Sequence, residues 1–167
     1  MKRTLALLFC VLGLAIAAAA HNDIDFSDLP LVETPAPVPA GYSSLNWGNF
    51  WYVDSGNQRT ITFIGGTFCG PVKPGCYGVI GSMGGRTAFQ PVSADVAAGS
   101  STHAVSQITV LAYNHGSFVG SASYKLTTTP QTITFPESWG GITEMQIQTD
   151  QPGGLLLFHF RFHHIMP

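Results

Sequence analysis

The 167-residue sequence contains little charge and little cysteine. Asp, Glu, Lys and Arg together make up 10% of it, and three cysteines are present. Beyond residue 20, no stretch repeats apolar residues at helical spacing over three turns. A Gly-x-Ser-x-Gly elbow and a phosphate-binding glycine loop leading into a helix are also missing. These absences exclude a helical domain, and they argue against a serine hydrolase or a nucleotide-binding enzyme.

The long hydrophobic run of this sequence stands at its start. Lys2 and Arg3 precede an uncharged apolar run, Leu5–Ile16, and four alanines follow it. This order is typical of a cleavable signal peptide, and a run of about 12 residues is too short to span a bilayer, which takes about 20. We therefore expect residues 1–20 to be removed. Residues 21–167 should then form a single secreted, extracellular domain without a membrane span.

Basic residues are scarce in the expected mature chain. Without the first twenty residues, five basic side chains stand against nine acidic ones, a net charge of −4 with histidine neutral. No cluster of Lys or Arg is present, so neither a nucleic acid nor an anionic membrane surface is an expected partner. Ser, Thr, Gly and Asn take the place of charge, which suits a neutral polar ligand better than an ionic one.

The remaining two cysteines, Cys69 and Cys76, enclose a short loop that contains Gly and Pro. In an oxidising compartment, an even pair of cysteines predicts a disulfide bond. A redox or metal-binding pair is the alternative, but the spacing is not Cys-x-x-Cys and no histidine stands near the pair in the sequence.

Short runs of alternating apolar and polar residues fill the rest of the chain, separated by Gly, Pro, Asn and Ser. They predict ten strands, at residues 22–28, 49–54, 59–64, 77–80, 86–90, 105–113, 117–126, 131–136, 142–149 and 155–165. Residues 29–40 contain four prolines and should form an extended connector, residues 94–102 a small-residue loop, and Asn114-His115-Gly116 a tight turn. So many strands in one small domain predict an all-β fold, a β-sandwich with jelly-roll connections.

The last expected strand separates apolar from basic side chains. Its apolar face holds Leu156, Phe158, Phe160 and Phe162, and its basic face holds His159, Arg161 and His163. We expect the apolar face to lie against the opposite sheet. The basic face should be exposed or line a groove.

Three segments carry a family resemblance: residues 24–30 (Ile-Asp-Phe-Ser-Asp-Leu-Pro), residues 39–50, which include a GYxxLxWxNF string, and the tail at residues 160–165. Together they resemble a group of secreted β-sandwich domains of fungal and bacterial extracellular proteins. The resemblance covers nearly the whole mature chain. It implies a jelly roll like that of galactose-binding domains, a fold that many carbohydrate-binding modules use.

The same resemblance raises the question of a structural metal. In jelly-roll modules of this kind, acidic residues of the first and last strands often help to hold a structural Ca²⁺, which prefers oxygen ligands. Asp25 and Asp28 are present here, but His163 and His164 stand where the group has Asp-Asn. If the first and last strands pair, His163 with Asp25 or Asp28 would suit a divalent metal such as Zn²⁺. The alternative is a set of surface histidines.

A second metal hypothesis concerns His21. If the signal peptide is cut after Ala20, His21 becomes the N-terminus, where its amine and ring can chelate copper, as in the lytic polysaccharide monooxygenases. A second histidine would have to lie beside it, and the candidates are His103, His115, His159 and His163. The alternative is a frayed polar terminus.

Aromatic residues supply the candidates for ligand binding. A ring exposed on a rigid sandwich can stack on the apolar face of a sugar, and Trp and Tyr add a polar handle. The candidates are Trp139, Tyr42, Trp51 and Tyr52. For Trp47 and Phe50 we favour core packing, and for Trp139 core packing and ligand stacking stay equally open.

Three functions remain open on these grounds. The first is a secreted, non-enzymatic binding protein that recognises carbohydrate or another extracellular surface. The second is an effector or cell-surface protein that binds a host or partner protein. The third is a copper-dependent oxidase that uses His21.

Thiol labelling of the native secreted protein tests the disulfide and the signal peptide together. Because a disulfide leaves no free thiol, Cys69 and Cys76 should resist a thiol reagent until a reductant is added. Intact mass spectrometry counts the labelled thiols and also gives the first residue of the mature chain. Labelling without reductant would contradict the disulfide, and a mass that includes residues 1–20 would contradict the cleavage.

Overall fold

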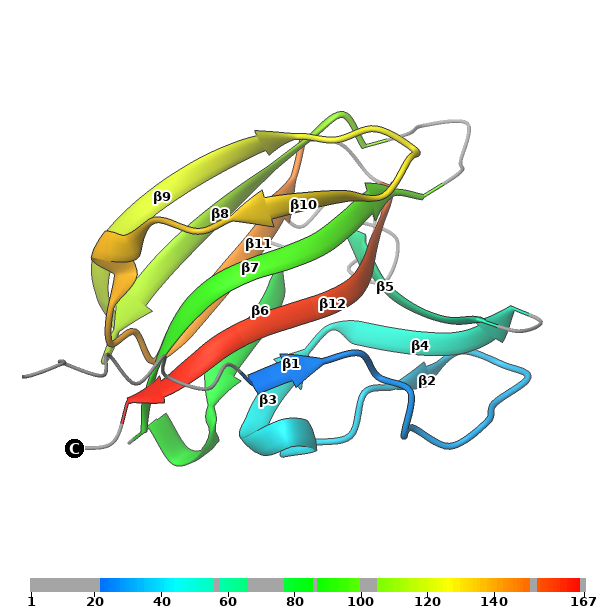
Figure 1. Ribbon diagram of the computed structural model, residues 1–167, viewed down its shortest axis with the longest axis horizontal. Helices are drawn as coiled ribbons and strands as arrows, with labels where there is room; N and C mark the ends of the chain where they lie inside the picture. Colours follow the sequence, from blue (N-terminus) through cyan, green and yellow to red (C-terminus); the bar gives the residue numbers. More distant parts are fainter. Residues whose placement is uncertain are drawn as a thin grey trace, which may run out of the picture.

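The structure is a computed structural model that describes residues 22–55, 58–65, 77–85, 87–99, 105–150 and 153–165. In these residues the chain forms two antiparallel sheets and three 3₁₀ turns, η1 (Tyr42–Ser44), η2 (Met83–Gly85) and η3 (Glu137–Trp139). The sheets face each other as the two layers of a sandwich (Figure 1). The fold is therefore an all-β sandwich of the jelly-roll type, as the sequence predicts. No helix in the described part of the chain is long and apolar enough to cross a membrane.

The larger sheet has the strand order β10-β7-β12-β5-β4-β2, and β1 also pairs with β12. Its strands are β1 (Asn22–Ile24), β2 (Ala36–Pro37), β4 (Phe50–Ser55), β5 (Gln58–Gly65), β7 (Ala88–Ala98), β10 (Gln131–Thr134) and β12 (Gly153–Ile165). The smaller sheet has the order β3-β6-β11-β8-β9. Its strands are β3 (Leu45–Gly48), β6 (Gly78–Ser82), β8 (Gln107–Asn114), β9 (Ser117–Lys125) and β11 (Glu144–Thr149).

The turn between β8 and β9 and the core position of two aromatic residues are confirmed. His115 and Gly116 both have positive φ, 49° and 80°, the backbone that a tight two-residue hairpin turn requires. Trp47 and Phe50 are 6% and 1% exposed. The indole of Trp47 contacts Phe26, Phe50 and Phe160 edge-on, with ring centroids 5.3–6.0 Å apart. This cluster joins the first segment of the chain to the last strand.

Three segments have more strand than the sequence suggests, and one of them is β3, which precedes the strand expected at residues 49–54. Residues 94–98 belong to β7, because this strand has hydrogen-bonded neighbours on both sides, β10 and β12. Ala94, Ala97 and Ala98 are buried there. Their small side chains therefore belong to a packed strand and not to an exposed loop. In the proline-rich segment, β2 pairs with β4 and the amide of Val38 donates to the carbonyl of Phe50, 3.0 Å away. Tertiary pairing overrides local propensity in the last two of these segments.

A β-bulge changes the expected faces of β12. Leu157 pairs with Val96 and His159 pairs with Asp95, so Phe158 is an extra residue without a partner on β7. Such an insertion shifts the alternation by one. Leu155 and Leu157 point inward before the bulge and Phe160 and Phe162 after it. The expectation that Leu156 and Phe158 share the buried face was therefore wrong, because that expectation assumed an unbroken period of two.

Trp139 lies in the core and is 2% exposed. Its ring stacks on Phe135 at a centroid distance of 6.0 Å and an interplanar angle of 23°. On its other side, a Cβ added to Gly120 of β9 would stand 2.9 Å from the indole nitrogen. The glycine thus leaves the space that the indole fills.

Substitution of Gly120 tests this packing. A Val at position 120 would overlap the indole of Trp139, and overpacking of this kind costs about 1–3 kcal/mol of the free energy of unfolding. We expect a lower urea midpoint and a lower thermal midpoint for Gly120→Val. Ser121→Val, at an exposed position of the same strand, is the matched control and should stay close to the wild type. Equal midpoints for all three proteins would contradict the packing described.

Candidate functional site

Polar side chains gather on the outer face of the larger sheet, where β10, β7, β12 and β1 lie side by side (Figure 1). The strand register orders them in two rows across the sheet. The first row runs from Thr132 through Asp95 to His159, and the second from Thr134 through Ser93 and Arg161 to Asp23. Ile133, Ala94 and Phe160 alternate with these residues and face the core. Ordinary strand alternation therefore presents the polar groups outward.

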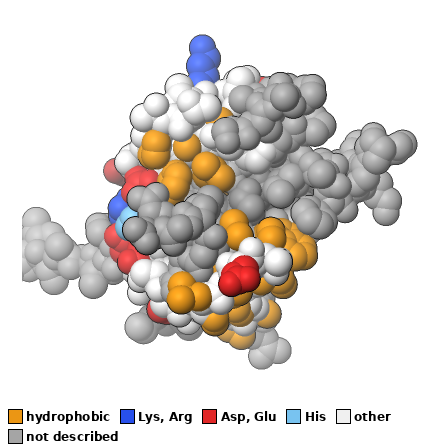
Figure 2. Space-filling model, turned by 90° about the vertical axis from the view of Figure 1, so that its right-hand side faces the viewer, with side chains coloured by type: hydrophobic (Ala, Val, Ile, Leu, Met, Phe, Trp, Pro, Cys, Tyr) orange, Lys and Arg blue, Asp and Glu red, His pale blue; other side chains and the backbone are white. Residues whose placement is uncertain are grey.

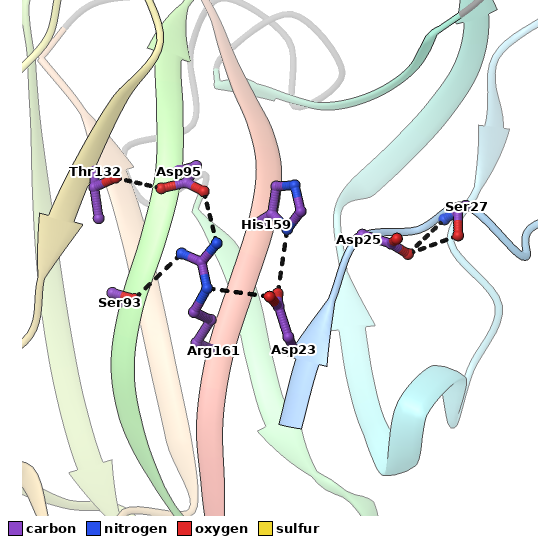
Figure 3. Close-up of polar contacts among 8 residues, drawn as sticks. All are labelled: Asp23, Asp25, Ser27, Ser93, Asp95, Thr132, His159 and Arg161. Atoms are coloured by element: carbon purple, nitrogen blue, oxygen red, sulfur yellow. Dashed lines mark hydrogen bonds and ion pairs between the residues drawn. The ribbon is translucent and has the colours of Figure 1, made fainter. Parts of the chain in front are cut away.

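Arg161 joins the two rows (Figure 3). Its Nε donates to Asp23 Oδ2 at 3.2 Å, and its Nη2 donates to Asp95 Oδ2 at 3.0 Å. Its Nη1 lies 3.5 Å from the hydroxyl of Ser93. The arginine thus bridges β1 and β7 across β12, and its charge is balanced by two carboxylates.

Further contacts hold the two carboxylates in place. The Thr132 hydroxyl donates to Asp95 Oδ1 at 2.6 Å, and Nδ1 of His159 lies 3.2 Å from Asp23 Oδ1. Partial burial alone would raise the pKa of Asp95, but the hydrogen bonds from Arg161 and Thr132 outweigh burial and leave this pKa below its usual value. Asp95 is therefore a fixed anion and a poor proton donor at neutral pH.

A cavity of about 350 Å³ opens beside this network. Its lining comprises Asp95, Pro130, Gln131, Thr132, Phe158 and His159. The β-bulge turns Phe158 out of the core, so that its half-buried ring lines the cavity together with His159. Bulges beside binding sites often redirect a side chain in this way. The basic face of the last strand was expected to be exposed or to line a groove, and His159 lines this cavity.

Figure 2 shows how charge is distributed over one end of the molecule. Acidic, basic and histidine side chains lie together at its left margin, while a basic side chain projects at the top and an acidic one stands among hydrophobic side chains toward the lower right. Charge is therefore grouped at one margin of this view but not confined to it.

The aromatic candidates lie apart from the cavity. Tyr52 and Trp139 are 4% and 2% exposed. The ligand-binding role predicted for Tyr52 is therefore contradicted, and of the two roles left open for Trp139 the structure shows core packing. Tyr52 follows the inward alternation of β4, and the turn η3 directs Trp139 into the core. Trp51 is half-buried on β4, two strands away from β12. The Tyr42 hydroxyl donates to Asp28, and burial together with this hydrogen bond raises its pKa.

The residues proposed for a metal site are not brought together. β1 and β12 do pair, but Ile24 stands opposite Phe160, so Asp25 follows beyond Phe160, toward His159 and away from His163. His159 and His163 are four residues apart on one strand, about 13 Å by strand rise. Asp25 accepts two hydrogen bonds from Ser27, which lower its pKa, and Figure 3 shows it turned toward that residue.

The carboxylate of Asp28 accepts a hydrogen bond from Tyr42. No group of three metal-binding side chains occurs among the described residues. The described residues therefore do not fit a calcium or zinc site built on Asp25, Asp28 and His163. His21, Cys69 and Cys76 lie outside the described residues.

Sequence analysis missed Asp23, Asp95, Thr132 and Phe158. A single signal pointed to Asp95, which is a lone carboxylate in a run of small and apolar residues. A buried or half-buried acid in such a run needs a partner. Arg161 becomes this partner through the pairing of β12 with β7, and no local sequence pattern predicts that pairing.

No protein-family model and no curated protein sequence matches the chain. Among solved structures, the fold is similar to that of a family two carbohydrate esterase from Cellvibrio japonicus, at 14% sequence identity and a TM-score of 0.45. The match covers 89% of this chain and 34% of the esterase, so the chain spans about a third of that protein. CtCBM11, a protein studied for its solution structure, dynamics and binding, is similar at 9% identity and a TM-score of 0.38. That match covers 91% of this chain and 99% of CtCBM11.

Likenesses this distant say nothing about the ligand of this chain. The resemblance to the secreted group with the GYxxLxWxNF string stays a prediction.

The pH dependence of stability tests the Asp95 contacts. Because the pKa of Asp95 is lowered on folding, its charged contacts stabilise the protein above the ordinary pKa of 3.8 and are lost as the pH falls below it. We expect Asp95→Asn to lower the free energy of unfolding by about 1–3 kcal/mol at pH 7. The difference from the wild type should shrink toward zero well below pH 3.8, as measured by urea unfolding.

Glu33→Gln is the control, since Glu33 is an exposed carboxylate in the connector. It should leave the stability at pH 7 unchanged. A loss for Asp95→Asn that is equally large at both pH values would speak against a charged role of this carboxylate.

Proposed function

We propose that this protein is a secreted, non-enzymatic binding protein, and that the cavity beside Phe158 takes a neutral sugar. The observation that carries the proposal is the β-bulge of β12, which places an aromatic ring next to hydrogen-bonding groups of three strands. A sugar offers an apolar ring face and a set of hydroxyl groups, and the cavity offers a partner for each.

The donors and acceptors around the cavity match a polyhydroxylated ligand. Gln131 supplies an amide, His159 a ring nitrogen and Asp95 a carboxylate. A carboxylate oxygen has room for more than one hydrogen bond, so Asp95 can accept from a ligand while Thr132 and Arg161 hold it in place. Such prior positioning lowers the entropic cost of binding.

The charge balance favours a neutral ligand and a binding role. Arg161 is the cation of the network, and it already contacts Asp23 and Asp95. An anionic ligand would face two carboxylates and gain no free arginine. Glycoside hydrolysis requires a carboxylic acid whose pKa is raised, whereas the pKa of Asp95 is lowered. The first point supports a neutral ligand, and the second supports recognition rather than glycoside hydrolysis.

A second candidate function, recognition of a partner protein, rests on a different surface. β9 is the last strand of the smaller sheet, and it exposes Phe118 and Val119 by 60% and 42%. Edge strands of globular proteins are usually protected by charge or proline, and β9 carries neither from Ser117 to Tyr124. An extended segment of another protein could add to this edge.

Binding to an array of neutral glycans tests the first proposal. We expect the wild type to bind at least one neutral glycan, and Phe158→Ala to weaken binding about tenfold or more, as removal of a central aromatic contact commonly does. Phe118→Ala is the matched control, because it removes a ring of the same size from the other sheet. This variant should bind like the wild type. A wild type that binds no glycan, or a Phe158→Ala variant that binds as well, would overturn the proposal.

A further inference from the structure

A second cavity lies on the same outer face. It measures about 400 Å³. Its lining comprises Gln90, Pro91, Val92, Thr134, Phe135, Glu137 and His163. These residues come from β7, β12 and the end of β10 with the turn η3 that follows it. The two cavities therefore share the same three strands.

The strand register places the second cavity further along these strands. Gln90 of β7 is paired with His163 of β12, and Asp95 is paired with His159. The row of Ser93 and Arg161 stands between these two pairs. From His159 to His163 the strand rises by about 13 Å, which is longer than one sugar ring. We refer to the stretch of β7 and β12 from one cavity to the other as the path.

Arg161 lies between the residues of the two cavities in the strand register, and its side chain is partly exposed. Three of its nitrogen atoms are directed at Asp23, Ser93 and Asp95 within the protein. It therefore leaves no uncompensated positive charge between the cavities. The second cavity adds Glu137, so the path as a whole carries more acidic than basic groups when histidine is neutral. Uronic acids and other anionic chains are disfavoured along it.

The second cavity also offers polar groups of the kind that hold sugar hydroxyls. Gln90 carries an amide, Thr134 a hydroxyl and Glu137 a carboxylate. A local bulge in β7 helps to form it, because Arg161 pairs with Ser93 and Phe162 with Pro91, which leaves Val92 as an extra residue. Each cavity thus lies beside one irregularity of the central pair of strands.

We propose that the two cavities are subsites of a single groove for a linear, neutral oligosaccharide, a trisaccharide or longer. One end of the chain occupies the cavity of Phe158, and the other end occupies the cavity of His163. This inference rests on the proposed function, since it assumes that the first cavity binds sugar. It adds the requirement that the ligand is a chain rather than a single ring or a terminal unit.

Chain-length dependence of binding tests the groove. The glycan backbone that gives the strongest array signal is used as a series from disaccharide to hexasaccharide, in calorimetric titrations against the wild type. We expect the affinity to rise about tenfold or more between the disaccharide and the longest chain. His163→Ala and, separately, Gln90→Ala should each reduce this ratio several-fold. Phe158→Ala should weaken binding at every length. Thr109→Ala, on the smaller sheet, should keep the wild-type ratio.

The outcomes separate the two proposals. An affinity that is the same at every length, or a length ratio unaffected in both second-cavity variants, overturns the single groove and leaves the sugar site at Phe158 standing. Absence of binding at every length overturns the proposed function, and the groove with it. Circular dichroism of each variant shows whether it is folded, and the use of two second-cavity variants keeps the test decisive if one of them does not fold.

Discussion

The β-bulge at Phe158 is the local constraint on which the arrangement of the larger sheet depends. β7 pairs with β12 along one edge, and on the other edge β5 pairs with residues up to Leu157 while β1 pairs from Phe160 onward. The bulge falls in the short interval where β12 changes neighbour from β5 to β1. Without it, either the leucines before this point or the phenylalanines after it would face solvent. The extra residue lets the leucines before it and the phenylalanines after it all face the core, although the two sets differ in their alternation. That extra residue is Phe158, whose ring lines the cavity.

Scarcity of charge gives the Arg161 network its importance. In a chain in which Asp, Glu, Lys and Arg make up only 10% of the residues, one guanidinium, two carboxylates and a histidine meet on β1, β7 and β12. The contacts are partly exposed, so each contributes modestly to the free energy of unfolding. Their structural effect is larger, because they fix the short strand β1 against β12 in one register. A shift by one residue would turn Asp23 away from Arg161 and Ile24 out of the core.

The fold class could be predicted from the sequence because it depends on a repeated signal, the alternation of apolar and polar residues in short runs. The site could not, because it depends on exceptions to that signal. The bulge at Phe158 leaves no local mark, and neither does the pairing of Asp23 with Arg161 across 138 positions of the chain. Trp139 shows the reverse case. Its glycine-rich surroundings suggest an exposed loop, yet the ring packs in the core, where Gly120 of another strand leaves space for it.

The same contacts that hold the sheet together also limit what the proposed groove could recognise. Because Arg161 is neutralised within the protein, the described lining of the two cavities presents hydrogen-bonding groups without an Arg or Lys that could attract phosphate, sulfate or carboxylate. Because most of these groups are fixed to strands, with Glu137 on the turn η3, their spacing largely follows the strand rise and pairing distance and should change little when a ligand arrives. Regularly spaced hydrogen-bonding groups without a free Arg or Lys match a repeating, uncharged polymer better than a compact anionic metabolite. The neutralised Arg161 and the irregularity of β12 therefore support the same proposed ligand class.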